Sequence, residues 1–515
     1  MILFGVFGML TVFCFPVSAS SFSLARAFSS HAVLQRAPAA ARIWGFDSEN
    51  STVSATIVGE EGLYWGVTGA DGVWRIVLPP HGAGGPYTIL FNSTTGGSTV
   101  LEDILFGLVF LCGGQSNMQF SIAAELHGAS YIADANSHPL IRVMTVGQLT
   151  RSPTVPLLDL AAVEQPWAVT TNSSIGDGDF SYFSALCYIF ALDLQASATL
   201  GTTSAGEPIP FGLVSANWGG TCLQNWDPSG GPAQCGVQEQ PFLYNANIHP
   251  FTVGPMALEG VLWSQGECNA DTHFHPNQTS FYACAFPLFI DSWRAAFQAP
   301  SLFFSFQVLP PYVNDSSACP SPCTDVADLR LAQLHGLRAQ GGNVYGANSL
   351  DCGDLLAPHG SIHPRDKTTI ARRMSSAAQV MLYGASLPYA SPVYASAVSS
   401  SSAGGDLTVR VGFSRPPGSS GRLTLRPSPC PSGGLGGLPP EECSWFEIQT
   451  KEDGAWHNAS GVELSQDGMA LILTVKGMGQ LVANASRAYY SAWPVAVLFS
   501  EEGLPAMPWW ERVDS

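Results

Sequence analysis

Charged side chains are scarce in this 515-residue chain. They make up 12% of it, about half of the roughly 25% that is typical of soluble proteins. Positively charged residues are the scarcer kind: the chain has 21 lysines and arginines and 39 aspartates and glutamates, which gives a net charge of −18. An acidic surface repels phosphate backbones, so nucleic acid is excluded as an expected partner.

Long apolar runs are missing beyond the N-terminus, so no segment is expected to span a membrane. The apolar run at the start has about 14 residues, fewer than the ~20 that a membrane helix needs. The small-x-small pattern Val17-Ser18-Ala19 follows it and predicts a secretory signal peptide over residues 1–19. We therefore expect a soluble protein that is secreted or lysosomal.

Seven N-x-S/T sequons agree with such a compartment and predict N-glycosylation. They lie at Asn50, Asn92, Asn172, Asn277, Asn314, Asn458 and Asn484.

No C-x-x-C motif or Cys/His cluster has zinc spacing, so no metal ion is expected. The chain has 12 cysteines, or 11 without the signal peptide, and most should pair in an oxidising compartment. Their spacing suggests Cys319 with Cys323 and Cys430 with Cys443, although sequence does not fix connectivity. The odd number leaves at least one free thiol, for which we take Cys112 at an apolar strand end.

The pattern of short runs divides the rest of the chain into three predicted domains. Residues 20–103 contain β-type runs separated by glycine and proline, which favour an N-terminal β-sandwich or jelly roll. Residues 104–393 alternate continuous apolar runs with helical stretches. Residues 394–515 follow a serine- and glycine-rich boundary and return to β-type runs, which predict a C-terminal β-sandwich.

The middle segment has the pattern of an α/β fold. Its apolar runs, such as DILFGLVFL at 103–111, do not alternate with polar residues and so predict strands buried on both faces. Apolar stripes predict helices within 180–196 and 367–382. Strands alternating with helices imply a mostly parallel sheet, whose ligand site lies beyond the carboxyl ends of its strands.

Polar and glycine residues gather at those strand ends. The first strand ends in Gly113–Asn117, which includes Ser116, the second in Asn217–Thr221 and the third in Trp263–Asn269. A later loop carries GSIHPRDK over Gly360–Lys367. The G-x-S-x-G elbow of α/β-hydrolases is absent, because Met118 stands in the place of its second glycine.

These residue types suit acyl transfer. A serine in a tight turn presents its hydroxyl and its own N–H, a Gly-Gly turn lets a backbone N–H approach a substrate, and a glutamine adds an amide donor. Three such donors converging on one point form an oxyanion hole. Pro364 would occupy the first position of a helix and hold the preceding His363 in a rigid loop, as a general base requires.

The blocks GQSNM, WGGT, W-x-QGE-x-N and IHPRDK, in this order, resemble the sialate O-acetylesterase family of the SGNH-hydrolase superfamily. The likeness also includes AVLQRAPAAARIWGF near the N-terminus and LYNANIHP at 243–250. It implies a flavodoxin-like α/β core with a parallel sheet, flanked by β-domains. It implies a serine esterase that removes O-acetyl groups, with 9-O-acetylated sialic acid as substrate and without a metal or organic cofactor.

The resemblance also implies residue roles. The nucleophile would be Ser116 and the base His363. The oxyanion donors would be the Ser116 N–H, the Gly219–Gly220 turn and Gln265. The predicted substrate-binding residues are Gln115, Asn117, Glu267, Asn269 and Arg330. The alternative for Gln265 and Glu267 is that they only support the loop, and the alternative for Arg330 is a surface salt bridge.

The sequence departs from the family pattern at two positions. Many relatives carry D-x-x-H before the base, but this chain has Gly360 there. Asp354 or Asp351 would then orient His363, or a backbone carbonyl near Ser361 would do so in a Ser-His dyad; Asp354 is the preferred carboxylate. Cys268 stands where a small residue is usual, and it would line the pocket or pair with another cysteine.

Two alternatives to a sialate esterase stay open on sequence alone. The same chemistry would serve another acetylated polysaccharide, of the xylan or pectin type. The second alternative is a glycan-binding protein whose esterase site is inactive, although the presence of both Ser116 and His363 argues against it.

Overall fold

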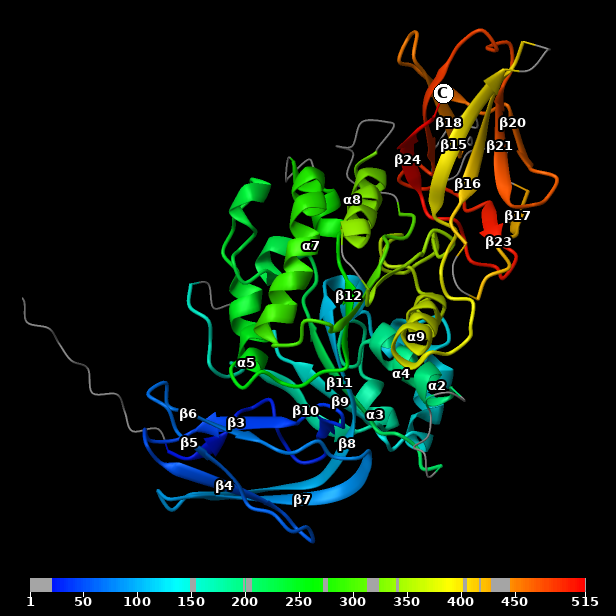
Figure 1. Ribbon diagram of the computed structural model, residues 1–515. Coiled ribbons are helices and arrows are strands. Elements are labelled where there is room, and N and C mark those ends of the chain that lie inside the picture. The colour runs from blue at the N-terminus through cyan, green and yellow to red at the C-terminus, as the bar shows by residue number, and fades with distance from the viewer. Residues whose placement is uncertain are drawn as a thin grey trace, which may run out of the picture.

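The computed structural model describes residues 21–148, 154–197, 200, 206–271, 277–312, 324–339, 342–401, 405–415, 418–427 and 445–514. The predicted signal peptide and the cysteine pairs Cys319–Cys323 and Cys430–Cys443 lie outside these residues. The described chain is a mixed α/β structure with a partly parallel central sheet and further antiparallel sheets (Figure 1).

The N-terminal region, drawn in blue in Figure 1, consists of mostly antiparallel sheets. The exception is Val33–Gln35, which pairs in parallel with residues 105–107. One sheet has the order β1-β3-β6, while β4 pairs with both β5 and β7. The side chains of Trp44 in β3 and Trp74 in β6 are fully buried. The strands are β1 Ser23–Leu24, β2 Val33–Gln35, β3 Arg42–Phe46, β4 Thr52–Ile57, β5 Tyr64–Val67, β6 Val73–Val77 and β7 Gly84–Ser93.

Strand β8, Ser98–Gly114, belongs to two sheets at once. Its first part pairs with β7 in the antiparallel sheet, and its last part pairs in parallel with β11 and β12. The predicted boundary at 103/104 falls inside this strand, so a single continuous strand carries the chain from one region into the next.

The central sheet has the order β10-β9-β11-β8-β12-β13-β14, with β10 the antiparallel member. Its other strands are β9 Ile141–Val146, β10 Val163–Val169, β11 Phe211–Asn217, β12 Gly260–Ser264, β13 Phe303–Gln307 and β14 Val344–Ala347. The helices are α1 Ser116–Gln119, α2 Gly128–Asp134, α3 Asn172–Ile175, α4 Ala185–Gln195, α5 His249–Thr252, α6 Glu267–Ala270, α7 Gln278–Ala296, α8 Asp325–Ala339 and α9 Thr368–Tyr383.

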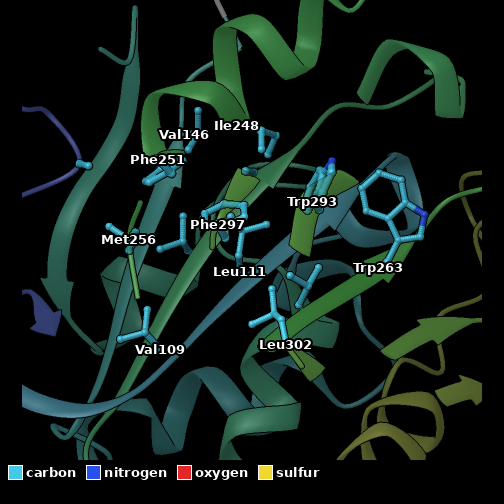
Figure 2. Close-up of a cluster of buried hydrophobic side chains, with 14 of the residues drawn as sticks. Val109, Leu111, Val146, Ile248, Phe251, Met256, Trp263, Trp293, Phe297 and Leu302 are labelled. Carbon is cyan, nitrogen blue, oxygen red and sulfur yellow. The ribbon is translucent and has the colours of Figure 1, made fainter. Parts of the chain in front are cut away.

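Alternating side chains of β8 enter two different cores, as expected for a strand buried on both faces. Val109 and Leu111 pack in the cluster that contains Trp293 of α7 (Figure 2). Leu108 and Phe110 pack on the opposite face, with residues of α4 and α9. The prediction of buried strands is therefore confirmed for this segment.

The helix predicted at 180–196 is shorter than its apolar stripe. Helix α4 begins at Ala185, after Ser184, whose hydroxyl accepts from Cys187 N. The preceding Phe180 has a positive φ of 57° and ends the helical pattern. Phe180 therefore lies in a loop. Helix α9 covers the stripe predicted at 367–382, but it begins at Thr368, so Pro364 precedes the helix and is not its first residue.

Cys112 is not the free thiol that the sequence suggested. Its side chain faces α4 and forms a disulfide with Cys187. Cys222 bonds with Cys268, and Cys235 with Cys284. Among the described cysteines Cys352 is the free one, and it is buried.

The C-terminal region, yellow to red in Figure 1, contains antiparallel sheets in the orders β15-β16-β21-β20 and β19-β18-β22-β24 and the pair β17-β23. Its strands are β15 Tyr394–Ser401, β16 Leu407–Phe413, β17 Leu423–Leu425, β18 Phe446–Thr450, β19 Trp456–Asn458, β20 Gly461–Leu464, β21 Ala470–Val475, β22 Ala483–Ala488, β23 Leu498–Ser500 and β24 Trp509–Arg512.

Arg330 on α8, a predicted substrate-binding residue, joins this region to the central one. Its side chain is fully buried. The guanidinium donates to Leu309 O and Pro310 O at 2.8 and 2.7 Å. It also donates to Ser491 O and Ala492 O at 2.7 and 2.9 Å. Every one of these partners is a backbone carbonyl, so Arg330 has a structural role.

Replacing Arg330 with methionine should destabilise the protein without changing substrate affinity. Four backbone carbonyls, two of them buried, would lose their donor, so the free energy of unfolding should fall by roughly 3 kcal/mol or more. The melting temperature measures this loss. The matched control is Arg372→Met, because Arg372 is exposed and makes only a 3.8 Å ion pair with Asp193. A raised KM at unchanged melting temperature would instead mean that Arg330 binds substrate.

Candidate active site

The turn after β8 positions Ser116. Gly114 has a φ of +136°, and a Cβ at this position would overlap Ser264 O at the end of β12. Gln115 N donates to the same carbonyl at 2.9 Å. The close approach requires glycine and turns the chain sharply into α1, so that Ser116 begins the helix at the carboxyl edge of the sheet.

His363 meets Ser116 from the loop before α9. Its Nε2 lies 2.9 Å from Ser116 Oγ, and its Nδ1 lies 2.8 Å from His359 O. Because a carbonyl can only accept, the second contact places the proton on Nδ1 and leaves Nε2 to accept from the serine hydroxyl. Burial lowers the pKa of His363, with the nearby Lys367 cation adding to the effect. The imidazole is thus held in the form of a base.

The structure does not bring Asp354 to His363, which corrects the preferred third member of a triad. Both carboxylate oxygens of Asp354 bind Arg365, at 2.6 Å to Nε and 3.0 Å to Nη2. This pairing lowers the pKa of the Asp354 carboxyl. The other candidate, Asp351, binds Arg373 with two contacts of 2.7 Å. The group that contacts Nδ1 of His363 is a backbone carbonyl, that of His359, as in the Ser-His dyad considered as the alternative.

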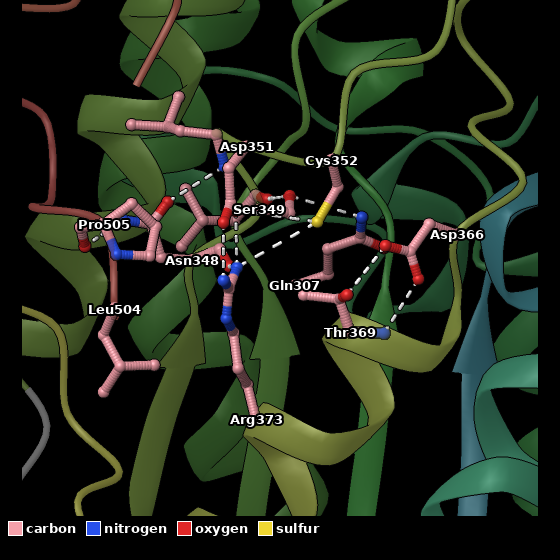
Figure 3. A network of polar contacts seen from close by, with 12 residues as sticks. Gln307, Asn348, Ser349, Asp351, Cys352, Asp366, Thr369, Arg373, Leu504 and Pro505 are labelled. Atoms are coloured by element: carbon pink, nitrogen blue, oxygen red, sulfur yellow. Dashed lines mark hydrogen bonds and ion pairs between the residues drawn. The ribbon is translucent and has the colours of Figure 1, made fainter. Parts of the chain in front are cut away.

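The two aspartates instead fix the loop that carries the base. Figure 3 shows Asp351 and Cys352 beside Arg373 of α9, which anchors the start of the loop. At the other end Asp366 accepts from Thr369 N at 2.9 Å and from its hydroxyl at 2.7 Å. With the Asp354–Arg365 pair between these points, the loop over residues 351–366, which we call the histidine loop, is anchored at three places.

A cavity of about 650 Å³ opens over the Ser116–His363 pair. Of the predicted site residues, it is lined by the pair itself and by Gln115, Gly219, Gly220 and Glu267. The further lining residues are Gln119, Phe180, Cys268, Asp271 and Ile362.

Two of the predicted backbone donors remain available at the cavity. Neither Ser116 N nor Gly220 N donates to another group in the described part of the chain. Gly219 N is already bound, because it donates to Gln119 Oε1 at 2.9 Å. A Cβ on Gly219 would lie 3.3 Å from Ser116 Cβ, so this glycine permits the close approach of the two turns.

Gln265 does not reach the cavity surface, contrary to its predicted place in the oxyanion hole. Its side chain is fully buried. The amide nitrogen donates to Asn269 Oδ1 at 2.8 Å, to Thr221 O at 3.1 Å and to Gln115 Oε1 at 3.3 Å. These bonds tie the turns after β8, β11 and β12 together beneath the cavity.

Asn117 and Asn269, both predicted to bind substrate, are likewise fully buried and are not among the residues that line the cavity. Asn269 accepts from Leu223 N at 3.0 Å and donates to Gln224 and Gln278. The amide groups of both asparagines form hydrogen bonds inside the protein.

Asn117 links the nucleophile to the histidine loop. Its amide donates to Ile362 O at 2.9 Å and to Glu267 Oε1. Its oxygen accepts from Lys367 Nζ at 2.6 Å. Burial lowers the pKa of Lys367 to about 8 and raises that of Glu267. This chain of contacts fixes the residues next to Ser116 and His363 relative to each other.

Sequence reasoning missed several members of the site. Lys367 ends the IHPRDK block, yet nothing local predicts that its ammonium is buried against Asn117. Gln119 lies one helical turn after Ser116, a spacing that could have identified it. Phe180 comes from a distant loop, and its ring lies 5.1 Å from that of His363. Cys268 does both things expected of it, because it lines the cavity and bonds with Cys222.

No group of three or more His, Cys, Asp or Glu side chains within the described ranges is arranged to hold a metal ion. No helix of these ranges is long and apolar enough to cross a membrane.

Comparison with known proteins relates this geometry to carbohydrate esterases. The family model for carbohydrate esterase, sialic acid-specific acetylesterase, matches residues 107–318. Human sialate O-acetylesterase is 31% identical over 393 residues, which cover 70% of this chain and 71% of the human protein. The mouse sialate O-acetylesterase is 30% identical over 440 residues, covering 74% and 77%.

A solved structure extends the likeness to nearly the whole chain. The crystal structure of a carbohydrate acetylesterase from Xanthomonas citri has a TM-score of 0.75 and 28% sequence identity, and the match covers 96% of this chain and 99% of that one. Together these matches show that the chain belongs to the sialic acid-specific acetylesterase family of carbohydrate esterases.

Proposed function

We propose that this protein is a serine esterase that removes O-acetyl groups from sugars through an acyl-serine intermediate. The observation that carries the proposal is the 2.9 Å contact between Ser116 Oγ and His363 Nε2 at the wall of a cavity. The contact of Nδ1 with His359 O supports it, because that contact leaves Nε2 ready to accept a proton.

The reaction would follow from this geometry. Ser116 Oγ attacks the acetyl carbonyl carbon while its proton passes to His363 Nε2, and the carbonyl electron pair moves onto oxygen. The N–H groups of Ser116 and Gly220 donate to this oxyanion. When the carbonyl reforms, the bond to the sugar oxygen breaks and His363 returns the proton to that oxygen. Water, activated by His363, then releases acetate from the serine.

The proposed substrate, core fold and location of the protein rest on its membership of the family. We take 9-O-acetylated sialic acid as the substrate, with another acetylated polysaccharide as the alternative. The order β11-β8-β12-β13-β14 is that of a doubly wound sheet, 2-1-3-4-5 when these strands are counted along the chain, and it supports a flavodoxin-like SGNH core. Three disulfides support a secreted or lysosomal location.

The first test compares acetate release by the wild type, Ser116→Ala and His363→Ala. With 4-nitrophenyl acetate and with a 9-O-acetyl sialoside, each substitution should lower kcat by roughly 10³-fold or more, since the nucleophile or its base is lost. The exposed residues Ser130 and His127 provide the matched controls Ser130→Ala and His127→Ala. Equal turnover by wild type and Ser116→Ala would disprove the proposal. Turnover of acetylxylan with little acetate release from the sialoside would show that the substrate is another acetylated polysaccharide.

A second prediction separates a dyad from a triad. Asp354→Asn should lower kcat by less than about 10-fold, because Asp354 braces Arg365 and does not contact His363. An aspartate that orients the histidine of a triad costs about 10⁴-fold when replaced by asparagine. Steady-state kinetics and a melting curve measure the effect. A loss of 10³-fold in a protein with unchanged melting temperature would restore Asp354 as a triad member.

A third prediction concerns pH. His363 acts only when neutral, and its pKa is lowered by burial and by the Lys367 charge. The acidic limb of kcat/KM should therefore lie below the ~6.5 of an ordinary histidine. Lys367→Met removes a positive charge, so the pKa of His363 should rise and the limb should move to higher pH. The exposed Lys451 gives the control Lys451→Met, which should leave the limb in place. A limb that does not move would show that Lys367 has no electrostatic role.

A further inference from the structure

The side chain of Gln115, directly before the nucleophile, uses its two polar atoms differently. Its Oε1 accepts from Cys268 N at 3.2 Å, from Gly266 N at 3.4 Å and from Gln265 Nε2 at 3.3 Å. Two of these partners are backbone N–H groups, which can only donate. They settle the orientation of the amide, with the oxygen toward the start of α6 and the nitrogen on the other branch.

The nitrogen of this amide is the atom left for the cavity. Gln115 lines the cavity with Ser116 although only 2% of its surface is exposed. Its Nε2 has no hydrogen-bond partner in the described part of the chain, and this nitrogen is not sealed from solvent. The amide of Gln265 is arranged in the opposite way. Its Oε1 is buried without a hydrogen-bond partner, and its nitrogen donates to acceptors inside the protein.

We propose that Gln115 Nε2, and not Gln265, is the side-chain donor of the oxyanion hole. The assignment rests on the proposed esterase function and completes it, with Ser116 N–H and Gly220 N–H as the other two donors. When Ser116 Oγ bonds to the acetyl carbon, the carbonyl electron pair moves onto oxygen and Gln115 donates a hydrogen bond to it. Gln115 transfers no proton, and the bond weakens again when the carbonyl reforms.

The three bonds that Oε1 accepts make this donor rigid. A preorganised donor costs no reorganisation when charge develops, which is the source of its catalytic effect. The same bonds tie Gln115 to α6, whose Cys268 is joined by a disulfide to Cys222 in the turn after β11. The turns that supply the oxyanion donors are therefore held to one another.

The substitution Gln115→Glu tests the assignment, because it keeps an oxygen to accept from Gly266 N and Cys268 N. It replaces the Nε2 donor with a second carboxylate oxygen, which also adds a negative charge. The expected result is a fall in kcat of about 10²–10³-fold, with KM within about 3-fold of wild type. The mirror control is Gln265→Glu, which removes donors to Asn269 and Thr221. It should lower the melting temperature and reduce the kcat of the folded protein less than Gln115→Glu does.

The outcomes distinguish this inference from the proposed function. If Ser116→Ala is inactive but Gln115→Glu retains full kcat, the oxyanion assignment alone is wrong. If Gln265→Glu shows the kcat loss at unchanged melting temperature, the donor is Gln265. If Ser116→Ala stays active, the proposed function itself is wrong.

A measurement on the wild type does not depend on any variant folding. In a crystal structure with an organophosphonate bound covalently to Ser116, the phosphoryl oxygen that occupies the oxyanion site should lie about 2.7–3.1 Å from Gln115 Nε2. A phosphoryl oxygen in contact with Gln265 Nε2 instead, or beyond hydrogen-bond distance of Gln115, would overturn the assignment.

Discussion

The close backbone contact at the end of β8 is the constraint on which the site depends. Gly114 lies against Ser264 so tightly that a side chain would overlap its carbonyl oxygen. Gln115 N donates to that same carbonyl at 2.9 Å, and Trp218 N donates to Gly114 O at 3.0 Å. The ends of β11, β8 and β12 are thus locked together, and the residues that follow each strand meet at one place.

The position of β8 explains why this contact is so rigid. The strand is the shared element of an antiparallel and a parallel sheet, and its last residues are buried on both faces. One face packs against α7, and the other against α4 and α9. A disulfide from Cys112 to Cys187 adds a covalent tie to α4. Movement of Ser116 would require both cores to repack, which close-packed interiors resist.

The polar part of the site is organised around the histidine loop. Asp354 and Asp351, the two candidate carboxylates, instead anchor this loop through Arg365 and Arg373, and Asp366 adds a contact with Thr369. A carbonyl orients His363, so the base has no carboxylate to stabilise its charged form. The neighbouring Lys367 also opposes that charge, and it does so from a buried position where its field is weakly screened. The site therefore favours a neutral imidazole.

The sequence by itself determined the family, the alternation of strands and helices, and the blocks that meet at the carboxyl edge of the sheet. Those features are local, because glycines at a turn and apolar runs of strand length act through neighbouring residues. Only the tertiary structure decided which way each amide points and which cation meets which carboxylate. Gln115 and Gln265 look alike in sequence, yet contacts from distant turns direct one toward the cavity and bury the other. The contacts of Asp354, Arg330 and Cys112 could not be predicted for the same reason, since their partners Arg365, Ser491 and Cys187 are brought to them by the fold.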